Sequence, residues 1–140
     1  MAYEILDHTA DAGVRGIGKT VEEAFCEAAR GMFSLMVDLE RVEPKEAMEV
    51  EVQADSLEGL LVAWLGELLA RRDIDGLVFS RFEVKIKRED SGYRLFGKAW
   101  GERLDPAHHR AGVEVKAATY FGMRVEKEGD RWIAQCVLDL

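Results

Sequence analysis

The hydrophobic residues follow two different spacings along the chain. In two segments they return about every 3.6 residues, the period of an amphipathic α-helix, and elsewhere they alternate with polar residues, as in a half-buried strand. The first helical segment spans residues 20–38 and begins at a capping box formed by Thr20 and Glu23. Its apolar stripe consists of Val21, Ala24, Phe25, Ala28, Ala29, Met32, Phe33 and Met36.

The second helical segment begins after Asp55 and Ser56, which can cap its first turn, and ends at Arg71 and Arg72, whose charges suit a helix C-terminus. Its stripe consists of Leu57, Leu60, Leu61, Trp64, Leu65, Leu68 and Leu69, which is typical of a helix that faces a core. Gly31 interrupts the first stripe, although glycine costs a helix about 1 kcal/mol relative to alanine. We therefore expect a neighbouring element to pack closely against Gly31.

Alternating segments predict strands at 3–6, 12–19, 48–54, 82–87, 93–102, 113–125 and 131–138. Turn residues at 89–92 and 128–130 join four of them into two hairpins. The order of elements predicts an α+β domain of two layers, with a largely antiparallel or mixed sheet packed against the two amphipathic helices. Because no Pro- or Gly-rich linker divides the chain, we expect one domain over residues 1–140.

Composition and charge narrow the function classes. The 140 residues are 48 % hydrophobic and carry a net charge of −8, which argues against a protein that coats nucleic acid through its phosphates. Acidic residues outnumber basic ones in the first 80 residues, whereas the remainder is mildly basic. This asymmetry fits either solvated faces or a docking face for a protein or a cation. Two cysteines without a spacing motif, no signal-peptide pattern and no membrane-length apolar run predict a cytoplasmic protein.

Candidate chemistry lies near both ends of the sequence. Asp7, His8 and Asp11 place two carboxylates and an imidazole in one short loop, which fits either turn formation or a site for a hard cation such as Ca²⁺ or Mg²⁺. Asp139 ends the last predicted strand, and the carboxylate of Leu140 follows it directly, so a second concentration of negative oxygen atoms is expected there.

Other polar residues are less specific. Lys116 fits a solvated strand charge, or a group that balances nearby carboxylates or contacts phosphate. Adjacent His108 and His109 could join His8 as zinc ligands, but neighbouring strand residues point apart and no zinc-binding spacing accompanies them. Phosphate-binding glycine loops and a serine-nucleophile motif are absent from the sequence, so nothing supports a nucleotide-binding core or a serine hydrolase.

Five motifs in order together resemble the archease family. They are His8-Thr9-Ala10-Asp11 before a strand and a Glu-Glu-Ala-Phe helix, Trp64-Leu65-Gly66-Glu67-Leu68-Leu69, Gly101-Glu102, Glu114-Val115-Lys116-Ala117-Ala118-Thr119-Tyr120, and a final strand ending in Asp139. The resemblance implies an accessory protein, not an enzyme, that activates an RtcB-type RNA ligase in tRNA splicing and RNA repair. It would promote guanylylation of the ligase and its multiple turnover.

The resemblance also implies a site. Asp11 and Asp139 would be side-chain ligands of a divalent metal, Ca²⁺ or Mg²⁺, and Leu140 would add a backbone or terminal oxygen. His8, Glu102 and Lys116 would face the partner or phosphate beside that metal. Phe121 stands where the family often has histidine, so a role for that imidazole does not carry over. The alternative is a chaperone or specificity modulator of a tRNA methyltransferase; a stand-alone metal hydrolase is disfavoured because no general base is evident.

Overall fold

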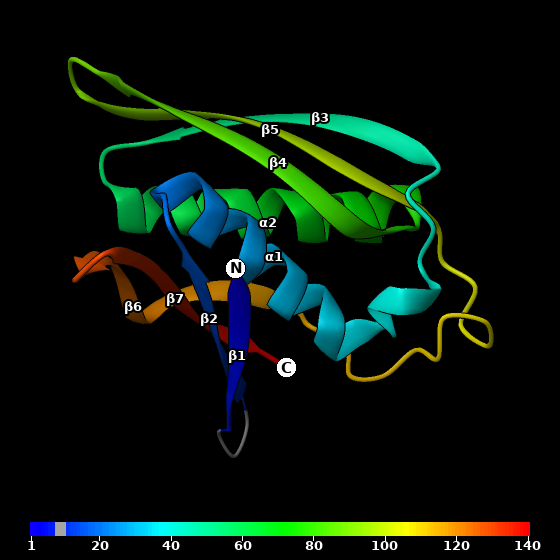
Figure 1. Cartoon of the computed structure of the whole chain (residues 1–140). Helices are drawn as coiled ribbons and strands as arrows, with labels where there is room; N and C mark the ends of the chain where they lie inside the picture. The colour runs from blue at the N-terminus through cyan, green and yellow to red at the C-terminus, as the bar shows by residue number, and fades with distance from the viewer. Residues whose placement is uncertain (8–10) are drawn as a thin grey trace.

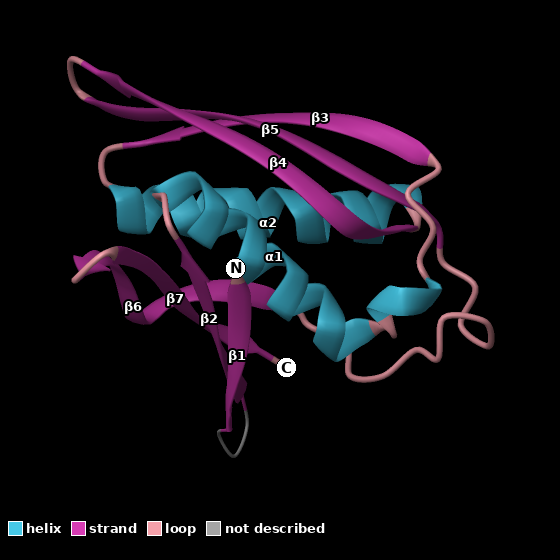
Figure 2. Cartoon of the chain, viewed as in Figure 1, coloured by secondary structure: helices cyan, strands magenta, loops and turns pink. Residues whose placement is uncertain are grey.

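The computed structural model describes residues 1–7 and 11–140 and arranges them in three layers. Within these residues, two helices lie between a three-stranded sheet and a four-stranded sheet (Figures 1 and 2). The helices are α1 (Val21–Met36) and α2 (Leu57–Asp75), and a short 3₁₀ helix, η1 (Leu39–Arg41), follows the first. The strands are β1 (Ala2–Asp7), β2 (Asp11–Gly18), β3 (Glu46–Ala54), β4 (Leu77–Glu89), β5 (Gly92–Arg103), β6 (Ala117–Glu128) and β7 (Arg131–Asp139).

Every paired strand is antiparallel to its neighbour. One sheet has the order β1-β2-β7-β6 and the other the order β3-β5-β4. The predicted α+β class, the helix pair and the two hairpins are confirmed. One detail is corrected. The sequence predicted two layers, one sheet packed against the helix pair, whereas the strands form two sheets with the helices between them.

The three-layer arrangement shows in the contacts of the two helices. Helix α1 contacts β2 in one sheet and β4 in the other, and α2 contacts β6 and β3. Each helix therefore buries apolar residues on two sides, and each sheet turns one face toward them. Alternation within a strand shows that one face is buried, but it does not show whether two such faces belong to one sheet.

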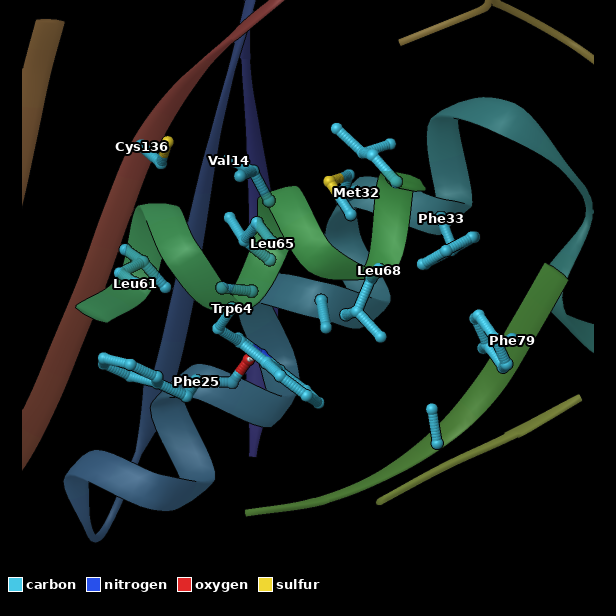
Figure 3. Packing of buried hydrophobic residues seen from close by; sticks show 14 of the residues in the cluster. Val14, Phe25, Met32, Phe33, Leu61, Trp64, Leu65, Leu68, Phe79 and Cys136 are labelled. Atoms are coloured by element: carbon cyan, nitrogen blue, oxygen red, sulfur yellow. Dashed lines mark hydrogen bonds between the residues drawn. The ribbon is translucent and has the colours of Figure 1, made fainter. Parts of the chain in front are cut away.

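Trp64 of α2 fixes how the two helices meet. Its indole is completely buried, and Nε1 donates a hydrogen bond to the backbone oxygen of Phe25 on α1 over 3.2 Å (Figure 3). Phe33 of α1 meets Phe79 of β4 edge to face, with ring centroids 5.6 Å apart. The core thus holds its aromatic rings in defined geometries, and the polar atom of its largest side chain has a partner.

The helix ends agree with the capping residues in the sequence. Thr20 accepts a hydrogen bond from the backbone N–H of Glu23, and Ser56 accepts one from Gly59. Helix α1 ends at Met36, two residues before the predicted end, and α2 continues to Asp75. Gly76 then ends α2 in the left-handed conformation (φ 70°), which glycine adopts without steric cost.

The predicted strand start at residue 113 is wrong, because β6 begins at Ala117. Two interactions hold the preceding segment against the helices instead. The N–H of Val113 donates to the backbone oxygen of Leu35 over 3.0 Å, and the Arg72 guanidinium donates to the backbone oxygen of Val115 over 2.9 Å. Val115 is completely buried although it lies outside β6, and Val113 is 47 % exposed, so periodicity alone did not separate this segment from a paired strand.

Gly31 of α1 packs closely against β1 and β2, and the sequence had predicted such a close neighbour at this position. A Cβ atom at this position would stand 2.4 Å from Cγ2 of buried Val14 and 3.1 Å from a ring carbon of Tyr3. The close approach of β1 and β2 to the helix thus depends on the absence of a side chain. Gly66 is also inside a helix, but a Cβ there would meet nothing within 4 Å.

These two glycines give a matched stability test. Gly31→Ala should destabilise the fold by about 1–3 kcal/mol, because the new methyl overpacks a buried contact. Gly66→Ala should stabilise it by about 1 kcal/mol, because alanine has the better helix propensity. Urea denaturation of both variants measures the two changes, and a stabilised Gly31→Ala protein would contradict the packing described here.

Candidate functional site

Two carboxylates face each other where the N-terminal hairpin meets the last strand. Asp11, the first residue of β2, is the direct cross-strand partner of Asp139, the last residue of β7. Their neighbours Ala12 and Leu138 are also partners and are buried against the helices. Because side chains alternate along a strand, Asp11 and Asp139 project together from the opposite, outer face of the sheet.

The third strand at this site is β6, whose first residue, Ala117, pairs with Asp139 on the other side. The N–H of Lys116 donates a hydrogen bond to the backbone oxygen of Asp139 over 2.8 Å, and Lys116 itself is exposed. Leu140 follows and is partly buried against the core. Asp11, Asp139, Leu140 and Lys116 are therefore brought together by β7, which runs between β2 and β6 (Figure 1).

Directly opposed like charges destabilise an antiparallel pair unless a cation or a hydrogen-bond donor compensates them. The outer face here offers carboxylate oxygens from two strands, β2 and β7. Oxygen donors of this kind suit hard divalent cations such as Ca²⁺ and Mg²⁺, so the donor set fits the metal that the sequence implied. His8, which was expected beside them, lies outside the described residues.

Glu102 lies elsewhere. It belongs to β5 of the other sheet, and its carboxylate is held by three groups: the backbone N–H of Glu43 at 2.9 Å, His109 Nε2 at 2.9 Å and Lys45 Nζ at 3.5 Å. The Glu43 N–H and the His109 ring hold the pKa of Glu102 at about 2. The expectation that Glu102 shares a face with Lys116 is not met, and its contacts instead connect β5 with the segments before β3 and after β5.

His109 was not assigned a role from the sequence, yet it is almost completely buried, with 1 % of its surface exposed. Its Nδ1 accepts a hydrogen bond from the N–H of Asp105 over 2.9 Å, so Nε2 carries the proton that it donates to Glu102. Its backbone oxygen accepts from the N–H of Asp38. His109 lies outside the apolar patterns of the sequence, which therefore gave no signal for such burial.

Glu102, His108 and His109 also place their ligand atoms within 4.8 Å of one another. The hydrogen bonds of His109 argue against a metal at this cluster. Nδ1 already accepts a backbone N–H, so binding a metal through Nε2 would require either an imidazolate or the loss of that bond. The cluster is better described as a clasp that fixes the segment between β5 and β6.

Comparison with known proteins identifies the family. A model of the Archease protein family (MTH1598/TM1083) matches residues 3–140. A "Protein archease" of Thermococcus gammatolerans is 52 % identical over 139 residues, covering 99 % of this chain and 98 % of the relative. The chain belongs to the archease family.

Further archease relatives extend this likeness. A "Protein archease" of Methanopyrus kandleri is 45 % identical over 140 residues and covers both chains completely. The solution structure of Methanobacterium thermoautotrophicum protein 1598 superposes with a TM-score of 0.87, at 40 % identity and 99 % coverage of both chains. The crystal structure of a Thermotoga maritima archease, described as a "possible chaperone", has a TM-score of 0.60 over 96 % of this chain and 94 % of that one, at 21 % identity, and shows the shared fold.

These archease relatives carry the name of a protein and not of a catalysed reaction. In the part of the chain that the structure describes, no helix is long and apolar enough to cross a membrane.

The contacts of Glu102 predict that the stability of this archease depends on pH. The folded pKa of Glu102 is depressed to about 2 from an ordinary 4.5, so the clasp stabilises the fold fully above pH 4.5 and is lost as the pH falls toward 2. Glu102→Gln should lower Tm at pH 7, and the difference from the native protein should shrink between pH 4.5 and 2. Thermal melts at pH 7, 4 and 2 measure this.

Asp90→Asn, at the exposed tip of the β4–β5 hairpin, is the control. The Tm of this variant should equal that of the native protein at each pH. A Glu102→Gln difference that stays constant from pH 7 to pH 2 would show that the clasp does not depend on the ionised carboxylate.

Proposed function

We propose that this protein is an accessory factor that activates an RtcB-type RNA ligase in tRNA splicing and RNA repair, promoting guanylylation of the ligase and its multiple turnover. The observation that supports the proposal is the pairing of Asp11 with Asp139 on the outer face of the four-stranded sheet. Membership of the archease family supplies the prior expectation for this role.

Asp11 and Asp139 would hold a divalent cation, Ca²⁺ or Mg²⁺, together with a backbone oxygen of Leu140. When bound, such a cation supplies positive charge that can be offered to phosphate oxygens in the active site of the partner. The chain's own residues position this charge: β7 fixes the two carboxylates between β2 and β6, and the Lys116 N–H fixes the backbone of Asp139. Lys116, exposed next to them, is placed to contact phosphate or a partner carboxylate.

The proposed cation should stabilise the folded protein. At a concentration of about 100 times Kd it would add about 2.7 kcal/mol, which corresponds to a rise in Tm of roughly 5–10 °C for a chain of this size. Asp139→Asn should abolish this rise. In EDTA the same variant should melt close to the native Tm, so that the difference between the two proteins appears only when the cation is present.

Thermal melts in EDTA and in excess Ca²⁺ or Mg²⁺ test both statements. Asp90→Asn, which removes an equal charge from a distant hairpin, should keep the full response to the cation. Superimposable native melting curves with and without the cations would count against the metal site.

The role itself is tested by RNA joining under substrate excess. A cognate RtcB-type ligase is assayed alone, with the native protein, with Asp139→Ala and with Asp90→Ala. Multiple turnover should rise with the native protein and with Asp90→Ala, and Asp139→Ala should lose most of the stimulation. No stimulation by the native protein would refute the proposal and direct attention to a chaperone role toward a tRNA methyltransferase.

Stimulation that survives Asp139→Ala would keep the partner but remove the carboxylate pair from the mechanism. Ligase guanylylation, followed with labelled GTP in the same four mixtures, separates an effect on that step from an effect on RNA joining.

A further inference from the structure

Near its C-terminal end, helix α2 carries two adjacent arginines, and one of them is buried. The side chain of Arg72 is 10 % exposed, whereas that of Arg71 is 32 % exposed. A cation suits the C-terminal end of a helix in either position, so the helix dipole does not require this burial. A guanidinium that leaves water needs hydrogen bonds to replace its hydration. The partners of Arg72 therefore indicate its role.

The Arg72 guanidinium donates hydrogen bonds in two directions. Nη2 donates to Oδ1 of Asp73 over 2.8 Å and to the backbone oxygen of Val115 over 2.9 Å. Nε donates to the same oxygen of Asp73 over 3.1 Å, and Nη1 lies against Sδ of Met36. The Asp73 carboxylate thus orients the planar group, and the group holds a carbonyl that lies 43 residues further along the chain.

Val115 depends on this donor. It is completely buried, but it precedes β6 and has no strand partner in the part of the chain that the structure describes. A buried backbone carbonyl without a hydrogen bond is unfavourable. Arg72 supplies the hydrogen bond that a strand ladder would supply elsewhere.

The same peptide unit contacts the end of β7 that carries Asp139. The oxygen of Val115 and the N–H of Lys116 belong to one planar trans peptide, in which they point in opposite directions. The Lys116 N–H donates to the backbone oxygen of Asp139 over 2.8 Å. One rigid peptide is therefore held by α2 on one side and by the last residue of β7 on the other.

Helix α2 is a firm support for this peptide. Trp64, Leu65 and Leu68 are completely buried, and the N–H of Gly76 donates to the backbone oxygen of Arg72 over 2.9 Å. The end of a strand opens more readily than the core, because its ladder continues in only one direction. Arg72 therefore connects a well-packed helix to a strand end that would otherwise depend on strand pairing alone.

We propose that Arg72 is a positioning residue for the cation site. Through the Val115–Lys116 peptide it holds the backbone of Asp139, and it thereby keeps the Asp139 carboxylate opposite Asp11. The inference rests on the proposed function and adds to the site a residue that touches neither the cation nor the ligase.

Amide hydrogen exchange in EDTA tests the contact without any cation. Arg72→Met keeps an unbranched apolar side chain but removes the donors, so the Lys116 N–H should exchange about tenfold faster or more, as in a locally opened segment. Arg71→Met is the matched control, because both ion pairs of Arg71, with Glu67 and Asp75, lie within α2. Its Lys116 N–H should exchange at the native rate.

Titration calorimetry with Ca²⁺ tests the consequence for the site. Arg72→Met should raise the Kd for Ca²⁺ roughly tenfold or more, as is typical when a group that orients a metal ligand is removed. Arg71→Met should keep Kd within about twofold, since partly exposed ion pairs contribute little. Arg72→Lys should give an intermediate Kd, because an ammonium retains the charge but lacks the planar fork that holds Asp73 and Val115 together.

A destabilised protein distinguishes positioning from a general loss of stability. Leu95→Ala leaves a cavity on β5 of the other sheet and should lower Tm, yet it should bind Ca²⁺ with the native Kd. Urea denaturation shows which variants are folded under the assay conditions. Where Arg72→Met is unfolded, Arg72→Lys takes its place in both measurements.

Three results would overturn the inference: native exchange of the Lys116 N–H in Arg72→Met, native Kd in that variant, or equal weakening of Ca²⁺ binding by Leu95→Ala. A native protein that binds Ca²⁺ without stimulating the ligase would refute the proposed function, and the Kd comparison would still decide the role of Arg72. A native protein that stimulates the ligase without binding Ca²⁺ would overturn the cation site and this inference, and the accessory role would stand.

Discussion

The pairing of β7 with both β2 and β6 is the constraint on which the rest of the structure depends. β7 brings the end of the chain into the middle of a sheet that the first residues begin, with Asp11 opposite Asp139 on one side and Ala117 opposite it on the other. The same strand buries Ala134, Cys136 and Leu138 against the helices. Core packing and the geometry of the carboxylate pair are therefore set by one register, and a slip of one residue would exchange the two faces of β7.

Local features of the fold could be predicted from the sequence because their causes are local. The caps at Thr20 and Ser56, the stripes of both helices and the two hairpins depend on residues a few positions apart. The pairing of β2 with β7 joins strands at opposite ends of the chain, and alternation in each of them is compatible with many partners. The division into two sheets could not be predicted for the same reason.

The same distinction applies to the candidate site: the chemistry of its residues could be predicted from the sequence, and their positions in space could not. The residues indicated a hard-cation site only in the loop that holds Asp11, and the resemblance to the archease family implied Asp139 as a second ligand. The strand register is what places the two carboxylates opposite each other. Glu102 is also a carboxylate that could bind a cation. Its hydrogen bond with His109, however, uses it to fix the segment that follows β5 in the other sheet. The register shift in β6 between Thr119 and Arg124 was not predicted either, because alternation across 113–125 also fits an uninterrupted strand.

The central place of a late strand also has a consequence for how the protein is made. Arg15 on β2 and Gln135 on β7 are hydrogen-bonded although 120 residues separate them in the sequence. During synthesis the β1–β2 hairpin emerges first and presents an unpaired strand edge until β7 has left the ribosome, and contacts of such high sequence separation form slowly. The three-stranded sheet and both helices are synthesised before β7. The part of the core that they share can therefore form before β7 completes the four-stranded sheet.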